Sequence, residues 1–297
     1  MPHSEGCHMS HTKRWEDLQI QDNFLFLKVM QNGDLCRRLL ETLLGFKIRE
    51  LSFPETEKVL ASNPDKLSVR LDVYVTDENG KVYDIEMQTS KPVNANRLDL
   101  RTRYYQSMLD QAAIEKGGHY ADLRESFIIF ICTFDPFKLN RRRYTFRNLC
   151  VEQTDLALKD RATRIFLNVK GVIGEESEEV QHFLNYVACN VAEGPLTHDI
   201  DAEVARVKQH DETKAEYMTL TALLADERYE GKMEGLAEGK AEGLAEGKAE
   251  GLAEGKAEMS LGIVSYMLSQ GRKADEISSI IGLPLDDVLA LAAKSQQ

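Results

Sequence analysis

A pair of carboxylates within residues 70–88 is the part of the sequence best suited to chemistry. This stretch, RLDVYVTDENGKVYDIEMQ, predicts two short strands around DENG, which suits a type I turn followed by a left-handed glycine. The turn predicts that Asp77 lies opposite Lys81 at its base. In the resulting register, Asp72 lies directly opposite Glu86.

The same register sorts the hairpin into an apolar and a polar face. The predicted apolar face consists of Leu71, Val73, Val75, Tyr83, Ile85 and Met87. The predicted polar face consists of Arg70, Asp72, Asp84, Glu86 and Gln88. A slip of one residue would mix the two faces, so the pattern itself supports this register.

The opposed carboxylates indicate a cation site. Directly opposed residues have Cβ atoms about 4.5–5.5 Å apart, and two carboxylates at that distance repel unless a proton or cation lies between them. An oxygen-only pair suits Mg²⁺ or Mn²⁺. Such an ion can bind a phosphate oxygen and activate water for phosphodiester hydrolysis. An exposed polar face without a metal is an alternative explanation of the spacing.

The elements around the hairpin predict an α/β fold. Helical spacing runs from Asp22 to a stop at Gly45, and residues 96–118 predict a second helix. The apolar run at 126–134 predicts a strand buried on both faces. Further strands are predicted in 48–60, RRYTFRNLCVE and TRIFLNVKG, and further helices in SEEVQHFLNYVACNVAEG and 199–229. Together they predict a mixed central sheet flanked by helices.

Charge and composition limit the partners. The net charge of −12 over 297 residues argues against nonspecific nucleic-acid binding by the whole surface. The segment 138–147 is locally basic and contains Arg141, Arg142 and Arg143. It is either a solvated loop and edge strand or a patch that contacts phosphates.

Location follows from the apolar runs and the cysteines. The run at 127–134 is too short to cross a bilayer, and the N-terminus lacks the apolar region of a secretory signal. The five cysteines are scattered without a C-x-x-C motif. We therefore expect a cytoplasmic protein with reduced thiols and no membrane partner.

The C-terminal part contains a repeat. GLAEGKAE recurs at 235–242, 243–250 and 251–258, with glycine at every fourth position from Gly231 to Gly255. Each helical glycine costs about 0.8–1 kcal/mol relative to alanine, which predicts a frayed helix or flexible linker. It is either a charged spacer or a segment that pairs with another chain. The following residues predict two or three short helices that resemble a helix-turn-helix, favoured here as an oligomerisation or docking module over a reader of DNA sequence.

The hairpin and the following helix resemble the PD-(D/E)xK nuclease superfamily. Asp72 followed by Glu86-x-Gln88 is the motif, and within the superfamily the sequence is most similar to the Rpn-type recombination-promoting nucleases and putative transposases. Other matching stretches are 21–30, 101–123, 127–137, the glycine repeat and 276–291. The resemblance implies a restriction-endonuclease-like core with a helical C-terminal extension.

The resemblance also implies roles for individual residues. Asp72 and Glu86 would bind Mg²⁺ or Mn²⁺, and Gln88 would complete the catalytic set in the place of the superfamily's lysine. Asp22 is the first candidate for an additional acid and Glu41 the second, with helix capping or a solvated face as the alternative for both.

Several cations and tyrosines are candidates for contact with the DNA backbone. Arg70 and Arg101 lie near the motif and could also replace the missing lysine charge. The full set is Arg70, Arg101, Tyr104, Tyr105, Arg141, Arg142 and Arg143. An alternative for the two tyrosines is that one lies in the core and the other at its rim.

The resemblance implies a Mg²⁺-dependent DNA endonuclease that acts in recombination or transposition. The alternative is a weak or inactive transposase-derived module that binds DNA or protein and self-assembles through its C-terminal tail as a homo-oligomer. The predicted parts are a disordered tail at 1–20, a core at 21–195, a helical extension at 196–229, a repeat linker at 230–258 and a small helical module at 259–297.

Overall fold

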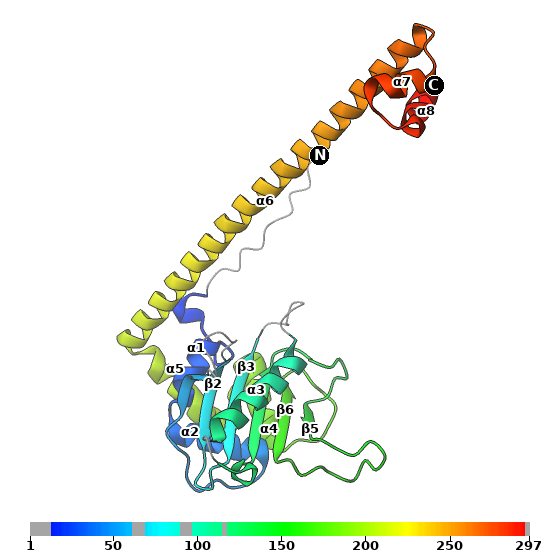
Figure 1. Ribbon diagram of the computed structural model, residues 1–297. Helices are drawn as coiled ribbons and strands as arrows, with labels where there is room; N and C mark the ends of the chain where they lie inside the picture. The colour runs from blue at the N-terminus through cyan, green and yellow to red at the C-terminus, as the bar shows by residue number, and fades with distance from the viewer. Residues whose placement is uncertain (1–12, 61–68, 90–96, 115–117, 295–297) are drawn as a thin grey trace. The chain divides into compact units, whose positions relative to one another are not determined.

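The computed structural model describes residues 13–60, 69–89, 97–114 and 118–294. The chain divides into two compact units at Leu220/Thr221. The first unit contains a sheet and the helices that cover it (Figure 1). The second contains most of a long helix and two short ones.

A mixed sheet forms the centre of the first unit. Its strands lie in the order β1-β2-β3-β4-β6-β5, in which β3, β4 and β6 are parallel and the other neighbours are antiparallel. Their bounds are β1 (Glu55–Leu60), β2 (Val69–Thr76), β3 (Val82–Gln88), β4 (Ser126–Cys132), β5 (Arg143–Phe146) and β6 (Ala162–Asn168). Every residue of β4 is buried, as its apolar run predicts.

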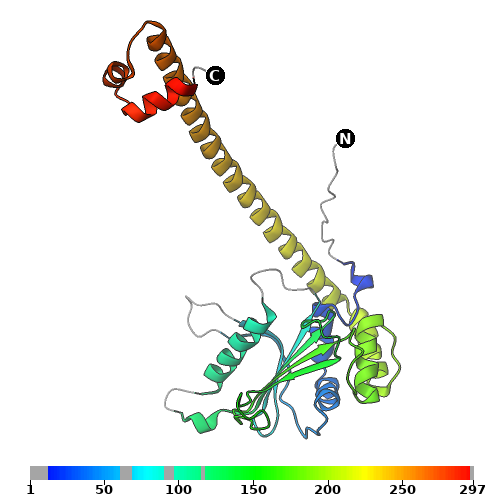
Figure 2. The same ribbon diagram turned by 90° about the vertical axis from the view of Figure 1, so that its right-hand side faces the viewer.

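Helices cover both faces of the sheet (Figure 2). One face carries α1 (Asn23–Met30), α2 (Gly33–Leu44), α4 (Glu178–Cys189) and α5 (Pro195–Lys208), and the other carries α3 (Leu98–Ala113). Each face has its own hydrophobic cluster. The predicted α/β fold with a restriction-endonuclease-like core is therefore confirmed.

The N-terminal helical stretch is two helices rather than one. The first ends at Met30, and the side chain of Asn32 accepts a hydrogen bond from the Leu35 amide at 3.3 Å to cap the second. An asparagine at this position favours a new helix start over continuation. The predicted stop at Gly45 is correct, since this residue has a left-handed φ of 76°.

The first unit extends beyond the predicted core at both ends. Residues 1–12 of the predicted tail lie outside the described residues, but Trp15 is buried and its indole donates to the Lys208 carbonyl at 3.3 Å. The apolar side of α5 and Tyr217 also join the cluster beneath α1. Apolar residues before and after residue 195 thus belong to the same cluster.

The predicted hairpin register is confirmed over most of its length. The Asp77 amide donates to the Lys81 carbonyl at 3.0 Å, and Gly80 has a left-handed φ of 72°. Tyr74 lies opposite Asp84, and the registered pairs continue to Val73 opposite Ile85. Beyond that pair, side chains take over the contacts between the two strands.

The separation of the hairpin into two faces is only partly correct. Val73 packs in the cluster beneath α1 and α2, whereas Leu71 packs in the cluster beneath α3. The regular alternation of side chains is broken at Asp72, next to which Glu57 on β1 has a left-handed φ of 56°. On the predicted polar face, Asp84 and Glu86 are buried, whereas Arg70 is exposed.

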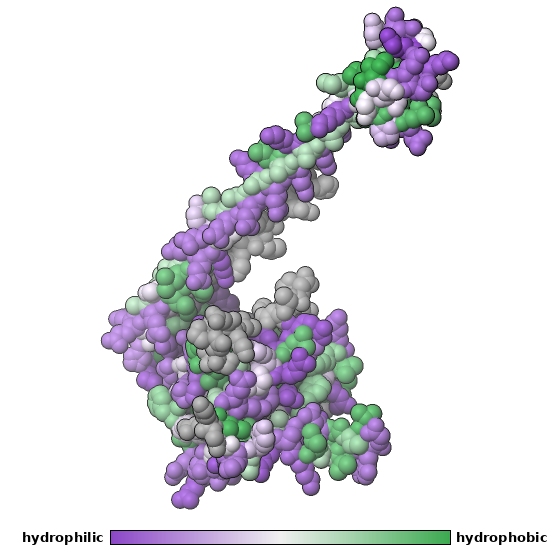
Figure 3. Space-filling model, in the orientation of Figure 1, coloured by the Kyte–Doolittle hydropathy of each residue, from purple (hydrophilic) through white to green (hydrophobic). Residues whose placement is uncertain are grey.

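The repeat is helical in the structure. Helix α6 (Asp211–Ser269) runs through it without a break, and α7 (Ala274–Ile281) and α8 (Leu285–Lys294) follow. The predicted frayed helix or linker is thus a continuous helix, which the alanine, leucine, glutamate and lysine residues between the glycines favour. Figure 3 shows a mildly hydrophobic stripe along this helix between hydrophilic side chains.

The three C-terminal helices form a small cluster of their own. Val264, Ile277 and Val288 are buried together at its centre. Gly271 and Gly282 adopt left-handed conformations at the two turns, as the sequence predicts for glycines that end helices. In the part of the chain that the structure describes, we find no helix with the length and apolarity to span a membrane.

Candidate active site

Asp72 and Glu86 are held together by reciprocal contacts between their strands. The Asp72 amide donates to Glu86 Oε1 at 2.9 Å, and the Met87 amide donates to Asp72 Oδ2 at 3.0 Å. Each carboxylate thus bonds a backbone amide of the opposite strand, just beyond the last registered pair. These bonds fix both acids in defined positions at one point of the sheet.

Asn23 fixes Asp72 from the other side. Its side-chain amide donates to both Asp72 oxygens, at 3.0 and 3.1 Å, from the first residue of α1. The sequence provided no direct signal for this contact, because the helix and the hairpin are 49 residues apart. An asparagine at a helix start is more simply explained by capping.

Asp84 is the most deeply buried acid of the region. It lies on β3 two residues before Glu86, and its side chain is fully buried. Within the described residues, neither of its oxygens has a hydrogen-bond donor. A buried carboxyl without hydrogen-bond donors costs free energy of folding. A proton shared between Asp84 and Glu86 would reduce this cost. The sequence placed Asp84 on the polar face but did not assign it to the site.

Arg101 of α3 is a cation that contacts this cluster. Its guanidinium donates to Gln88 Oε1 at 3.0 Å and to Glu86 Oε2 at 3.3 Å. It also contacts the Tyr105 hydroxyl at 2.8 Å. One planar guanidinium therefore links the two residues of the Glu-x-Gln motif. Its fixed fork of N–H donors restricts the orientation of both side chains.

The electrostatics of the cluster favour protonation of its carboxyl groups or the binding of a cation between them. Burial raises the pKa of Glu86 to about 8, and the neighbouring charge of Asp72 adds to the rise. Burial also raises the pKa of Asp72, against the hydrogen bonds from Asn23 and Met87. Burial and the nearby acids hold the pKa of Asp84 well above its usual range. Arg101 offsets only part of this effect, so the site has a deficit of positive charge.

The donor atoms of the cluster fit a hard divalent cation. Asp72 and Glu86 offer carboxylate oxygens, which Mg²⁺ and Mn²⁺ prefer, and Asp84 adds an acid without a donor. Among the described residues, no three acidic, histidine or cysteine side chains form a complete metal-binding group. Mg²⁺ usually takes only one or two carboxylates and completes its shell with water and substrate oxygens.

The other residues near the hairpin that were predicted to contact DNA differ in their exposure to solvent. Arg70 is exposed and forms an ion pair with Glu57 at 3.5 Å. Tyr105 is buried in the cluster beneath α3, while Tyr104 packs against that cluster and stays partly exposed. This matches the alternative of one tyrosine in the core and one at its rim.

The structure places Asp22 in the turn before α1. Its carboxylate accepts from Lys13 at 2.7 Å and from the Gln19 amide at 2.7 Å. The neighbouring Asn23, and not Asp22, contacts Asp72.

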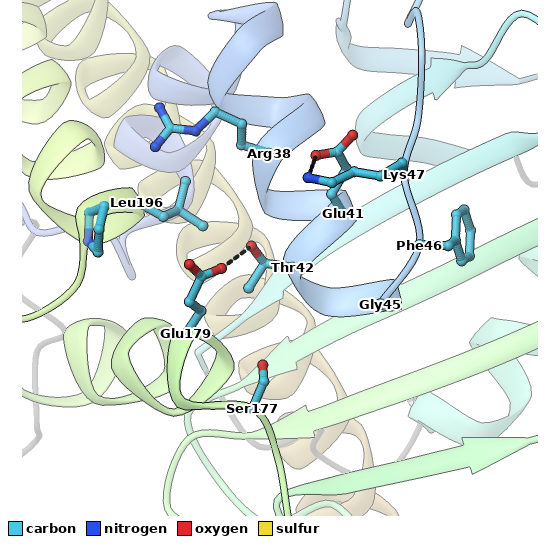
Figure 4. Close-up of a pocket in the computed structure, with 10 residues that line it drawn as sticks. Arg38, Glu41, Thr42, Gly45, Phe46, Lys47, Ser177, Glu179 and Leu196 are labelled. Atoms are coloured by element: carbon cyan, nitrogen blue, oxygen red, sulfur yellow. Dashed lines mark hydrogen bonds and ion pairs between the residues drawn. The ribbon is translucent and has the colours of Figure 1, made fainter.

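Glu41 lies on the opposite face of the sheet. It lines a hollow of about 470 Å³ between α2, α4 and the start of α5 (Figure 4). Lys47 pairs with it at 2.9 Å, and the Ile48 amide donates to it at 2.9 Å. This acid supports the local fold of the chain after α2.

The basic segment before β5 is largely used within the fold. Arg143 forms two hydrogen bonds of 2.8 Å with Glu176, and Arg142 donates to the Gly174 carbonyl at 2.8 Å. The side chain of Arg141 is exposed. The structure therefore separates these three arginines into two that hold loops together and one that faces solvent.

The comparisons give one match. The family model described as PD-(D/E)XK nuclease family transposase matches residues 24–230, which include all six strands, the carboxylate cluster and α3. No curated protein and no solved structure matches the chain.

Proposed function

The chain belongs to the PD-(D/E)XK nuclease family transposases, and from this membership and its carboxylate cluster we propose that it is a Mg²⁺-dependent DNA endonuclease. The proposed reaction is hydrolysis of a phosphodiester bond. The observation that carries the proposal is the junction of β2 and β3, where Asp72 and Glu86 are locked together by 2.9 and 3.0 Å bonds. A purely structural role does not require the buried Glu86 and the partly buried Asp72 to lie together at this point.

Asp72 and Glu86 would hold the cation. When bound, Mg²⁺ or Mn²⁺ lowers the pKa of coordinated water and stabilises negative charge on the phosphate. Asn23 orients Asp72 through two hydrogen bonds, and Arg101 orients Glu86 and Gln88. Mutation of residues that orient metal ligands in this way typically lowers metal affinity or activity by about 10–100-fold.

Gln88 and Arg101 together would replace the lysine of the family motif. Gln88 cannot carry a charge, but its amide can orient an attacking water by hydrogen bonding. Arg101 is permanently charged and bonds Gln88 directly at 3.0 Å. We infer that the positive charge near the water comes from α3 and not from the hairpin itself.

The biological role would be DNA recombination or transposition inside the cell. The family description supports this role, and the protein's partner would be DNA. The net charge of −12 means that contact with DNA depends on local basic residues and the metal, rather than on the whole surface.

A plasmid-nicking assay tests the proposed function. Wild type should relax supercoiled DNA in Mg²⁺ or Mn²⁺ and lose this activity in EDTA. Asp72→Ala should reduce the rate by about 100-fold or more, because it removes a ligand of the ion that activates water. Asp155→Ala, in an exposed loop, is the matched control and should cleave like wild type. Equal residual cleavage by wild type and Asp72→Ala would remove the nuclease assignment.

A module that binds DNA without cutting it is the second candidate. The observation that favours it is the uncharged Gln88 at the lysine position of the motif. In that case, wild type would bind DNA in the same assay conditions but leave the plasmid supercoiled at every metal concentration.

A further inference from the structure

A second hollow lies on the sheet face that α3 covers. It has a volume of about 450 Å³ and lies between the first part of α3 and strands β5 and β6. Its lining includes three arginines and three phenylalanines, namely Arg103, Arg147, Arg164, Phe137, Phe146 and Phe166. None of these residues belongs to the carboxylate cluster.

The hollow has an excess of positive charge. The buried Nε of Arg164 has no hydrogen-bond partner within the described part of the chain. The acidic lining residue, Asp99, is bonded to Arg97 at 3.2 and 2.5 Å, which lowers its pKa and leaves its charge compensated. Arg103 and Arg147 are exposed at the rim. A buried donor without a partner, among further cations, favours a ligand that brings anionic acceptors.

The hollow also has an aromatic wall. The ring of Phe146 lies 5.0 Å from that of Phe137 and 5.7 Å from that of Phe166. The rings of Phe137 and Phe166 meet edge to face at 5.1 Å and support the outer ring. Phe146 is 42% exposed, so part of its ring is available to a ligand. Aromatic rings beside arginines are the surface on which proteins stack single-stranded bases.

The strand register places this hollow beside the candidate active site. Asp84 on β3 is registered with Ile128 on β4, which is registered with Arg164 on β6, and Arg164 with Phe146 on β5. Neighbouring strands are about 4.8 Å apart, so Arg164 lies about 10 Å from Asp84 along this row. Helix α3 borders both places, since Arg101 contacts Glu86 and Arg103 lines the hollow.

We propose that this hollow binds an unstacked base of a single-stranded DNA segment next to the cleavage site, with its arginines on the adjoining phosphates. The inference rests on the proposed function and names the form of DNA that the site accepts. A base in a regular duplex cannot reach such a surface, because it is stacked and paired on both sides.

Fluorescence anisotropy tests this inference without cleavage. The full chain, in EDTA, is titrated against a labelled oligothymidine of about 12 nucleotides and against an abasic strand of the same length and charge. Wild type should bind the oligothymidine more tightly, by roughly five- to 100-fold. Phe146→Ala should lose this preference while it still binds the abasic strand like wild type. Phe53→Ala, which truncates a phenylalanine that is 77% exposed, is the matched control and should keep the preference.

A second variant keeps the test informative if Phe146→Ala does not fold. Arg147→Gln changes an exposed side chain and should weaken both strands equally, with a smaller dependence of affinity on salt. Equal affinity of wild type for the two strands, or an unchanged preference in folded Phe146→Ala, would overturn the inference. The inference would also be overturned if the protein bound duplex DNA tightly and Phe146→Ala weakened duplex binding as strongly as it weakened oligothymidine binding. None of these binding results bears on plasmid nicking. If the protein does not nick plasmid but keeps its base preference, the nuclease proposal fails and the hollow remains a proposed binding site.

Discussion

At the scale of single residues, the site is a balance between buried acids and one guanidinium. Asp72, Asp84 and Glu86 all have raised pKa values, and burial is the first cause in each. Arg101 supplies the compensating charge from α3. This compensation lowers the cost of keeping acids in the interior of the hairpin.

Arg101 should be required for cleavage through its position. Arg101→Ala should lower the cleavage rate by about 10–100-fold, because Glu86 and Gln88 lose the group that orients them. Arg101→Lys should recover part of the rate, since lysine keeps the charge but cannot bond both residues with a planar fork. Plasmid nicking at several Mg²⁺ concentrations measures the effect. Arg38→Ala, on the opposite face, serves as the control, and a rate for Arg101→Lys below that of Arg101→Ala would contradict this role.

Glu86 should make the metal-free protein less stable as the pH rises. Its pKa is about 8 in the fold against an ordinary value of 4.5, so the folded state holds a proton that the unfolded chain releases. The stability from this proton is fully present below about pH 4.5 and is lost between about pH 4.5 and 8. Glu86→Gln mimics the protonated acid and removes this loss.

Thermal unfolding in EDTA at a series of pH values measures this difference. The unfolding temperature of Glu86→Gln relative to wild type should rise from about pH 5 to pH 9. Glu175→Gln, which changes an exposed acid, should show a constant difference over the same range. A constant difference for Glu86→Gln as well would mean that the Glu86 carboxyl is not held protonated by the fold.

The sequence predicted the acids of the site better than the groups that position them. Asp72 and Glu86 could be predicted because hairpin register and family resemblance both depend on local sequence. Asn23 could not, since its contact with Asp72 depends on how α1 docks onto the sheet. The resemblance to the PD-(D/E)xK nucleases is confirmed by the family match.

At the scale of elements, turns and caps decide where sequence reasoning succeeds. The DENG turn sets the register correctly, because Gly80 provides the left-handed φ that the turn needs. The sequence predicts one helix where the structure has two, because the Asn32 side chain caps a new helix. The broken alternation at Asp72 could not be predicted, because it arises from contacts with β1 and α1 that no local pattern records.

The glycines of the repeat should weaken α6. Apart from neighbouring residues and the backbone of the helix itself, no atom lies within 4 Å of the position that a Cβ would take at Gly239, Gly243 or Gly247. Alanine at these positions should therefore stabilise the helix by about 0.8–1 kcal/mol each. The ellipticity at 222 nm of the triple variant should persist to a higher temperature than that of wild type. An unchanged melting curve would indicate that α6 is not helical through the repeat in solution.

At the scale of the whole molecule, the two units have separate cores. The clusters on both sides of the sheet lie within the first unit, and the cluster of Val264, Ile277 and Val288 lies within the second. The cluster beneath α1 includes residues from outside the predicted core of 21–195 at both ends. Trp15 and Tyr217 lie in segments that read as polar, yet they pack against each other with rings 5.7 Å apart.

Self-association through the C-terminal part is a proposal at this scale. On α6, Leu236, Leu244 and Leu252 are 59%, 74% and 61% exposed, and pairing with a second copy would cover them. The full chain should then scatter light as an oligomer, and a chain ending at residue 229 as a monomer. Equal numbers of subunits for the two chains would contradict this proposal and leave the active site unaffected.

The central claim is that Asp72 and Glu86 form a cation site for DNA cleavage, and its most direct test is the rate of plasmid nicking by Glu86→Gln against wild type. Glutamine keeps the shape of Glu86 but removes its charge, and the hydrogen bonds from Asp72 and Arg101 can persist in part. Nicking by wild type should rise with Mg²⁺ concentration, and the rate should fall by about 100-fold or more in Glu86→Gln. Cleavage by Glu86→Gln at the wild-type rate, with the same dependence on Mg²⁺, would contradict it.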